Sequence, residues 1–150
     1  MQQDEHFMRL ALEEAKKALE IGEVPVGAVI IDGSGNIIGR GYNTTERDNS
    51  PLRHAEMIAI EEAALFLKNR RLSDCILYVT LEPCPMCAGA IMSARIKRLV
   101  YGAFDEKGGA CASIFNLYDY PVNHKPMVKS RVLADECGEI LSGFFKNLRT

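Results

Sequence analysis

No stretch of this 150-residue chain is apolar for long enough to cross a bilayer. The longest apolar run, Val24 to Ile31, is far shorter than the ~20 residues of a membrane-spanning helix. The first residues, Met1 to Glu5, also lack the basic and then apolar pattern of a secretory signal. We therefore expect a cytoplasmic protein with no membrane partner.

The sequence contains no internal repeat, no low-complexity tract and no interdomain linker. Its composition, 47% hydrophobic and 25% charged residues, is that of an ordinary globular domain. A chain of this length can bury about 70% of the surface that it exposes when unfolded, which is enough for a full core without disulfides. Residues 1–150 are expected to form a single domain.

Net charge is also low, at −2, so the whole molecule has no field that would attract nucleic acid. A polyanionic partner would have to bind a local basic patch. One candidate segment lies between Asp119 and Asp135, where no acid occurs and three basic residues do, and two more basic residues follow near the end: Lys125, Lys129, Arg131, Lys146 and Arg149. On its own, this pattern is more typical of a solvated surface.

Five cysteines make an odd number. Without a secretory signal, an odd count favours reduced thiols, metal ligands or a nucleophile over a disulfide framework. Cys75, Cys111 and Cys137 are expected to be small buried apolar groups. Cys84 and Cys87 lie three residues apart, directly after Pro83, and this spacing favours a chemical role for both.

Hydrophobic periodicity and turn residues predict ten elements. Their order is helix, two strands of a hairpin, and then helices alternating with strands, which indicates a three-layer α/β/α sandwich around a five-stranded mixed sheet. The expected helices are 4–21, 54–67, 84–94, a short one at 113–118 and 135–148, and the expected strands are 26–31, 37–42, 76–80, 98–101 and 127–133.

Four residues carry a chemical pattern. His54, Cys84 and Cys87 offer one imidazole and two thiols, a donor set that binds zinc and leaves one of four tetrahedral positions open. Both cysteines stand near a predicted helix start, where the positive helix end favours thiolates. Glu56 follows His54 by two residues and so points away from the metal-binding direction of His54. It could flank the open position and move protons, which is a hydrolase arrangement.

Two other readings of these residues remain open. A Cys-x-x-Cys pair can be a thioredoxin-like redox pair, although that role leaves His54 and Glu56 unexplained. A structural zinc or nucleic-acid-binding module would need a fourth protein ligand, for which the candidates are His6, Cys75, Cys111, His124 and Cys137. Such a module has no use for a free carboxylate beside the metal.

The combination of His54-Ala55-Glu56 with Pro83-Cys84-Pro85-Met86-Cys87 resembles the cytidine-deaminase superfamily of zinc-dependent nucleobase deaminases. The resemblance runs from the opening helix to Phe144-Phe145 and is greatest to the bacterial members that act on adenosine in tRNA. It implies a five-stranded sheet between helices, which agrees with the predicted order. It also implies one zinc ion per subunit and a homodimer.

The resemblance further implies hydrolytic deamination of adenosine to inosine at the wobble position of a tRNA anticodon stem-loop. Zinc-bound hydroxide would attack adenine C6, with the unligated Glu56 as the proton shuttle. Deamination of a free base or nucleoside, such as guanine or cytidine, remains the alternative because the superfamily shares the zinc site. A histidine as first ligand and the loop at Asp105 favour RNA.

The same resemblance suggests substrate-binding residues. Motifs around Val24–Val29, Asn43, Asp105–Ala110, Asn123-His124 and Leu133–Phe145 are similar to segments near RNA in the family, and they nominate Ala28, Asn43, Asp105, Asn123 and Phe145. One departure concerns the end of the chain, where relatives often carry a cluster of arginines and this sequence has only Lys146 and Arg149. We expect lower RNA affinity and a weaker salt dependence as a result.

Overall fold

The computed structural model describes residues 2–148 and contains one mixed sheet with the strand order β2-β1-β3-β4-β5. The first three strands in this order pair antiparallel, and β3, β4 and β5 run parallel to one another. Their bounds are β1 Gly27–Ile31, β2 Ile37–Tyr42, β3 Ile76–Leu81, β4 Arg98–Ala103 and β5 Met127–Lys129. The predicted five-stranded mixed sheet is confirmed.

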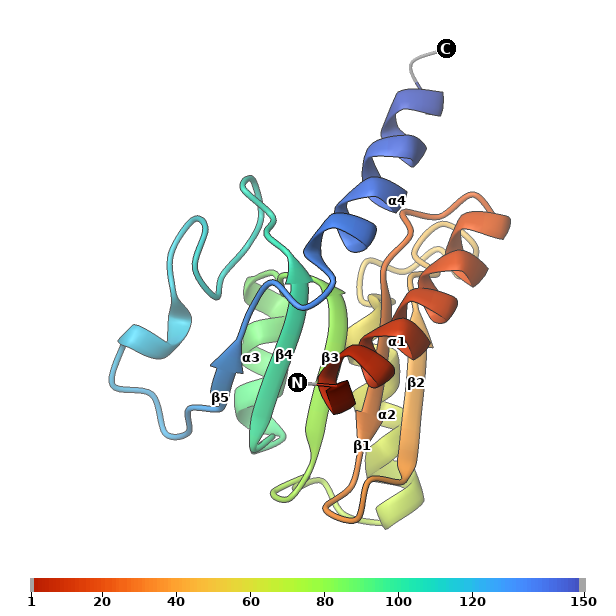
Figure 1. Ribbon diagram of the computed structural model, residues 1–150. Helices are drawn as coiled ribbons and strands as arrows, with labels where there is room; N and C mark the ends of the chain where they lie inside the picture. The colour runs from red at the N-terminus through yellow and green to blue at the C-terminus, as the bar shows by residue number, and fades with distance from the viewer. Residues whose placement is uncertain (1, 149–150) are drawn as a thin grey trace.

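Helices cover both faces of this sheet, so the predicted three-layer sandwich is confirmed (Figure 1). α1 (Gln2–Glu20) and α4 (Ala134–Leu148) lie on one face, and α2 (Ala55–Leu67) and α3 (Pro85–Ser93) on the other. Alternate residues along each strand face opposite layers. Thus Val29 and Tyr78 pack beneath α1, whereas Ile30 and Val79 join the core beneath α2 and α3.

Glycines on β2 set how closely α2 approaches the sheet. Cβ atoms at Gly39 and Gly41 would overlap the backbone carbonyl groups of Ala59 and Ala55 in α2. The absence of side chains at both positions therefore allows the helix to lie almost in contact with the strand. This close packing fixes the first turn of α2, which carries Glu56.

Two predicted elements are wrong. The predicted helix at 113–118 is a three-residue 3₁₀ helix, η1 (Leu117–Asp119), because Leu117 N donates to Ala110 O instead of to Ser113 O and the Asn116 side chain caps the turn by accepting from Tyr118 N. The last strand ends at Lys129 instead of residue 133. Arg131 and Leu133 have positive φ values of 67° and 54°, and this left-handed backbone cannot continue a strand.

The part of the chain from residue 2 to residue 148 has no helix that combines the length and the apolar character needed to cross a membrane.

Candidate active site

His54, Cys84 and Cys87 meet at the ends of α2 and α3. Nδ1 of His54 lies 3.6 Å from Sγ of Cys84 and 3.5 Å from Sγ of Cys87. A tetrahedral zinc ion with ordinary Zn–N and Zn–S bonds separates such atoms by about 3.6 Å. The three donor atoms all lie within 4.8 Å of one another. Their spacing therefore fits three corners of a tetrahedron around one zinc ion.

The start of α3 prepares the thiols for a metal. Cys84 is the N-cap residue in an extended conformation, and Pro85 occupies the first turn, where its missing N–H is not needed. The Cys84 side chain makes no capping bond. Hydrogen bonding with Cys87, and then with His54, lowers the pKa of Cys84 to about 4 despite its partial burial. Cys84 is therefore a thiolate, the form that binds metals.

No fourth protein ligand joins this group within residues 2–148. The candidates for a structural zinc site lie elsewhere: His6 is exposed on α1, His124 bonds to the Ile96 carbonyl, and three cysteines are buried in the core, namely Cys75, Cys111 and Cys137. The predicted buried roles of these three cysteines are confirmed. One coordination position therefore stays open, as catalytic zinc sites require.

Glu56 lies in the first turn of α2 and is only 4% exposed. Burial raises the pKa of its carboxyl group to about 7, a value suited to giving and taking protons at neutral pH. Glu56 is not part of the group of metal-ligating atoms, although it lines the same pocket as His54 and Cys84. Glu56 therefore lies beside the three ligating residues without belonging to their group.

The pocket over these residues has a volume of about 240 Å³ and opens to solvent. Of the proposed substrate-binding residues, Asn43 and Asp105 line it, together with Val24 and Val26. Oδ1 of Asn43 accepts a hydrogen bond of 2.9 Å from Ala55 N, which fixes the side chain at the start of α2. Its amide nitrogen makes no hydrogen bond to residues 2–148.

The other three proposed contacts lie outside this pocket. Ala28 is fully buried in β1, paired with Gly41 and Val79, and faces the core. Asn123 follows η1 and accepts a bond from Arg95 through its carbonyl oxygen. Phe145 is 42% exposed on α4.

Phe145 lines a second hollow that adjoins the pocket. This groove, of about 820 Å³, runs between α4 and the loop after β4. Val24, Leu81 and Asp105 line both spaces, so the two hollows are neighbours. A ligand larger than one base can therefore extend from the metal site toward α4.

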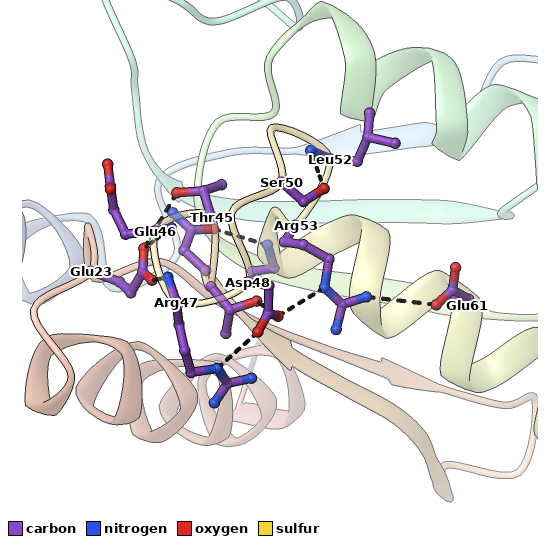
Figure 2. Close-up of polar contacts among 12 residues, drawn as sticks. Glu23, Thr45, Glu46, Arg47, Asp48, Ser50, Leu52, Arg53 and Glu61 are labelled. Atoms are coloured by element: carbon purple, nitrogen blue, oxygen red, sulfur yellow. Dashed lines mark hydrogen bonds and ion pairs between the residues drawn. The ribbon is translucent and has the colours of Figure 1, made fainter.

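The segment between Asn43 and His54 is held by two acids, the buried Glu23 and the exposed Asp48 (Figure 2). The carboxylate of Glu23 accepts bonds from the backbone N–H groups of Glu46 and Arg47 at 3.1 and 2.7 Å and contacts the Thr45 hydroxyl. Asp48 accepts a bond of 2.8 Å from Thr44 and pairs with Arg47 and with Arg53. Both ends of this segment carry site residues, so the two acids fix the rim of the pocket.

Sequence reasoning missed Glu82, which is 2% exposed and lines the pocket. Its carboxylate accepts bonds from the backbone N–H groups of Asp105, Cys111 and Ser113, and from the Ser113 hydroxyl. Burial alone would raise the pKa of Glu82, but these bonds together lower it, so the group is ionised. An acid directly after an apolar strand and before Pro83-Cys84 was the available signal.

The basic residues of the C-terminal third do not form one patch. Lys129 pairs with Asp4 at 3.1 Å, and Arg131 lies over the Phe104 ring. Lys125 lines a hollow at the far end of the strands, and Lys146 is exposed on α4. Arg149 lies outside the described residues.

Comparison with known proteins agrees with this site. The model of the cytidine and deoxycytidylate deaminase zinc-binding region matches residues 1–103. The tRNA-specific adenosine deaminase of Haemophilus influenzae is 53% identical over 147 residues, which cover 97% of this chain and 85% of that protein. The Bacillus subtilis protein of the same name is 50% identical and covers 99% of this chain and 92% of its own length.

A solved structure from a study of A-to-I editing by tRNA:A34 deaminases at the wobble position superposes with a TM-score of 0.88. It is 48% identical and covers 91% of this chain and 99% of its own. The fold and the sequence therefore agree over nearly the whole chain. The chain belongs to the zinc-dependent cytidine and deoxycytidylate deaminase family and, within it, to the tRNA-specific adenosine deaminases.

Proposed function

We propose that this protein converts adenosine to inosine at the wobble position of a tRNA anticodon by hydrolytic deamination. The observation that carries this proposal is the open three-ligand site with the buried, unligated Glu56 beside it, in a chain about half identical to tRNA-specific adenosine deaminases. The zinc ion held by His54, Cys84 and Cys87 supplies, when bound, a water activated for attack at neutral pH.

Residues of the pocket carry out proton transfer and hold the base. Glu56 takes one proton from the attacking water at its carboxylate and delivers it to the ring nitrogen next to adenine C6. It then takes the second proton from the hydroxyl group added to C6 and passes it to the amino group, which leaves as ammonia. Asn43, fixed by its bond to Ala55, orients the purine through its free amide nitrogen. Val24 and Val26 give the pocket an apolar wall against which a base can pack.

The wobble base must leave the anticodon loop to enter so small a pocket. The adjoining groove then receives the neighbouring nucleotides. Asp105 stands where pocket and groove meet and can accept from a ribose hydroxyl, and the exposed ring of Phe145 offers a surface for stacking. These placements support an anticodon stem-loop over a free base as the substrate. No such account is proposed for Ala28 or Asn123.

Three further proposals concern the protein as a whole. We propose one deaminase domain, because all five strands belong to one sheet. We propose a homodimer, because Leu65 and Phe66 at the end of α2 are 75% and 67% exposed in the single chain. Exposed apolar side chains of this kind often mark a surface that another protein subunit covers. We propose the cytoplasm as its location, because its tRNA substrate and reduced zinc-binding thiols belong there.

The deciding experiment measures inosine in an anticodon stem-loop that carries a wobble adenosine, after incubation with the zinc-loaded protein. Free adenosine, cytidine and guanine are tested in parallel. Conversion of the stem-loop alone supports the proposal. Turnover of a free base or nucleoside without turnover of the stem-loop overturns the RNA substrate and keeps the zinc chemistry.

Glu56→Gln is the critical variant, because it keeps the size of the side chain and removes its proton transfer. We expect kcat to fall by about 10²–10⁴-fold with the zinc content unchanged. Glu62→Gln, an exposed position on the same helix, is the matched control and should retain activity. Equal activity of the two variants would contradict the role given to Glu56.

A further inference from the structure

A basic hollow lies at the end of the sheet opposite the zinc site. It has a volume of about 430 Å³ and is lined by residues from three separate connections, each just before or at the start of a parallel strand: Arg71, Ser73, Arg95, Lys97, His124, Lys125 and Met127. Four of these side chains are cationic and none is acidic. We call this hollow the basic pocket.

The cations of the basic pocket are not neutralised by the protein. No carboxylate within residues 2–148 forms an ion pair with Arg71, Arg95, Lys97 or Lys125. Nearby cations differ in this respect, since Arg98 and Lys129 both pair with the buried Asp4. Four like charges left together on a molecule of net charge −2 point to an anionic ligand.

Backbone hydrogen bonds fix the three connections to one another. Leu72 N donates to Ala94 O at 2.7 Å, and Met127 N donates to Lys97 O at 2.9 Å. Arg95 donates from Nη1 to the carbonyl of Asn123 at 3.1 Å, and His124 donates from Nε2 to Ile96 O at 2.7 Å. The cations therefore stand on a rigid platform, and little order has to be gained on binding.

The shape of the basic pocket favours a polymer. Its lining spans the starts of three adjacent strands, β3, β4 and β5, which at ~4.8 Å between strands corresponds to about 10 Å. A row of this length is longer than a single phosphate group, so it can contact more than one phosphate of a nucleic-acid backbone. The cations are mostly on exposed loops, which suits a backbone that passes over the surface.

We propose that the basic pocket binds backbone phosphates of the tRNA outside the anticodon stem-loop. The six residues of β3, about 20 Å long, separate it from the zinc pocket, so the same subunit cannot hold the anticodon loop in both places. The ligand of the basic pocket is therefore a second segment of the RNA. The identification of the RNA as tRNA rests on the proposed function. The charge and geometry of the basic pocket do not depend on the proposed function.

The test measures RNA binding as a function of salt concentration in the zinc-loaded Glu56→Gln protein, which does not consume the RNA. Lys97→Gln and Lys125→Gln are compared singly and together with the parent, using full-length tRNA and the isolated stem-loop. Lys16→Gln, an exposed lysine on α1, is the matched control. Each removed phosphate contact should reduce the slope of log affinity against log salt by about 1.

We expect the slope with full-length tRNA to fall by about 2 in the double variant, and the slope with the stem-loop to stay unchanged. An unchanged slope with full-length tRNA would overturn the proposal. An equal fall with the stem-loop would overturn the assignment to the rest of the tRNA. Loss of binding to inorganic tripolyphosphate with an unchanged tRNA slope would identify a small phosphate ligand and also overturn it.

The binding test separates this inference from the proposed function. If the wild-type protein forms no inosine but the double variant loses salt dependence with full-length tRNA, the basic pocket stands and the proposed reaction fails. If inosine forms, the same two lysine substitutions made in the active protein, with Glu56 intact, should raise KM for full-length tRNA and leave kcat unchanged, because the basic pocket is remote from the reacting atoms.

Discussion

Gly109 lies against the carboxylate of Glu82, so closely that a Cβ atom at position 109 would overlap the carboxyl group. The two residues come from different connections at the carboxyl end of the sheet. Glu82 reaches the backbone N–H groups of Asp105 and Ser113 only because position 109 has no side chain. The loop that carries Asp105 is therefore folded around one ionised side chain.

Glu82→Gln should loosen this loop. The amide has one oxygen and faces several donors, so at least one buried N–H group loses its acceptor, at a cost of about 1–3 kcal/mol in the free energy of unfolding. We expect a raised KM for the stem-loop and an unchanged zinc content. Denaturant unfolding, zinc analysis and steady-state kinetics check this, with the exposed Glu13→Gln as control. An unaltered KM would show that the loop does not depend on Glu82.

Gly109→Ala should destabilise the same loop by overpacking. A methyl group displaces the Glu82 carboxylate, and we expect a loss of about 1–3 kcal/mol in the free energy of unfolding. Gly143→Ala is the matched control, because a Cβ atom there meets nothing within 4 Å and alanine favours the helix. Thermal unfolding of both variants gives the comparison, and equal effects would contradict the steric argument.

Asp4 should make the free energy of unfolding depend on pH in the acidic range. Its bidentate bonds from Arg98 at 2.7 and 2.8 Å lower its pKa far below the ordinary value, and Tyr78 and Lys129 add to this. A carboxyl group whose pKa is lowered by folding stabilises the protein at any pH above the unfolded pKa of about 3.9 and loses that contribution as the pH falls further.

We therefore expect Asp4→Asn to lower the free energy of unfolding by about 2–3 kcal/mol at pH 7. The difference from the parent should shrink progressively below about pH 4, where the unfolded carboxylate also protonates. Denaturant unfolding between pH 3 and 7 measures it. Asp119→Asn, on an exposed position, should show no such trend. A difference that stays constant down to pH 3 would exclude the ionised Asp4 as its origin.

Removal of one zinc ligand should abolish both metal binding and activity. Cys87→Ala takes away one of the three donor atoms, and two donors rarely retain zinc against a chelator. The parent should contain one zinc per chain by elemental analysis, and the variant close to none. Cys75→Ala, at a buried cysteine outside the site, should keep its zinc. Zinc retained by Cys87→Ala would contradict the assigned ligand set.

Glu23→Gln tests whether the rim of the pocket needs its acid. The buried carboxylate holds the backbone of Glu46 and Arg47, and its loss should free the segment that carries Asn43. We expect a raised KM for the stem-loop and a loss of about 1–3 kcal/mol in stability. Steady-state kinetics beside Glu20→Gln, an exposed neighbour on α1, give the measure. Identical KM values in both variants would assign Glu23 a structural role only.

Local patterns were sufficient for most of the fold. The period of the apolar residues, the glycine-rich hairpin and the proline after Cys84 act within a few residues of the chain, and helices and strands follow such signals directly. The same holds for the ligands, because donor types and short spacing identify His54, Cys84 and Cys87 before any contact is known. Glu56 follows from its place two residues after His54.

Long-range bonds decided the rest. The prediction of a helix at 113–118 was wrong because Glu82, from a distant part of the chain, holds the N–H groups of Cys111 and Ser113. In the loop folded around it, Leu117 N donates to Ala110 O instead of to Ser113 O. Ala28 lies in the core and Asn123 beyond the pocket, which only the packed sheet shows. The sequence by itself thus determined the zinc chemistry and the layers, since these depend on residue type and period. The tertiary structure alone decided which charges remain unpaired, because pairing depends on distances between remote segments.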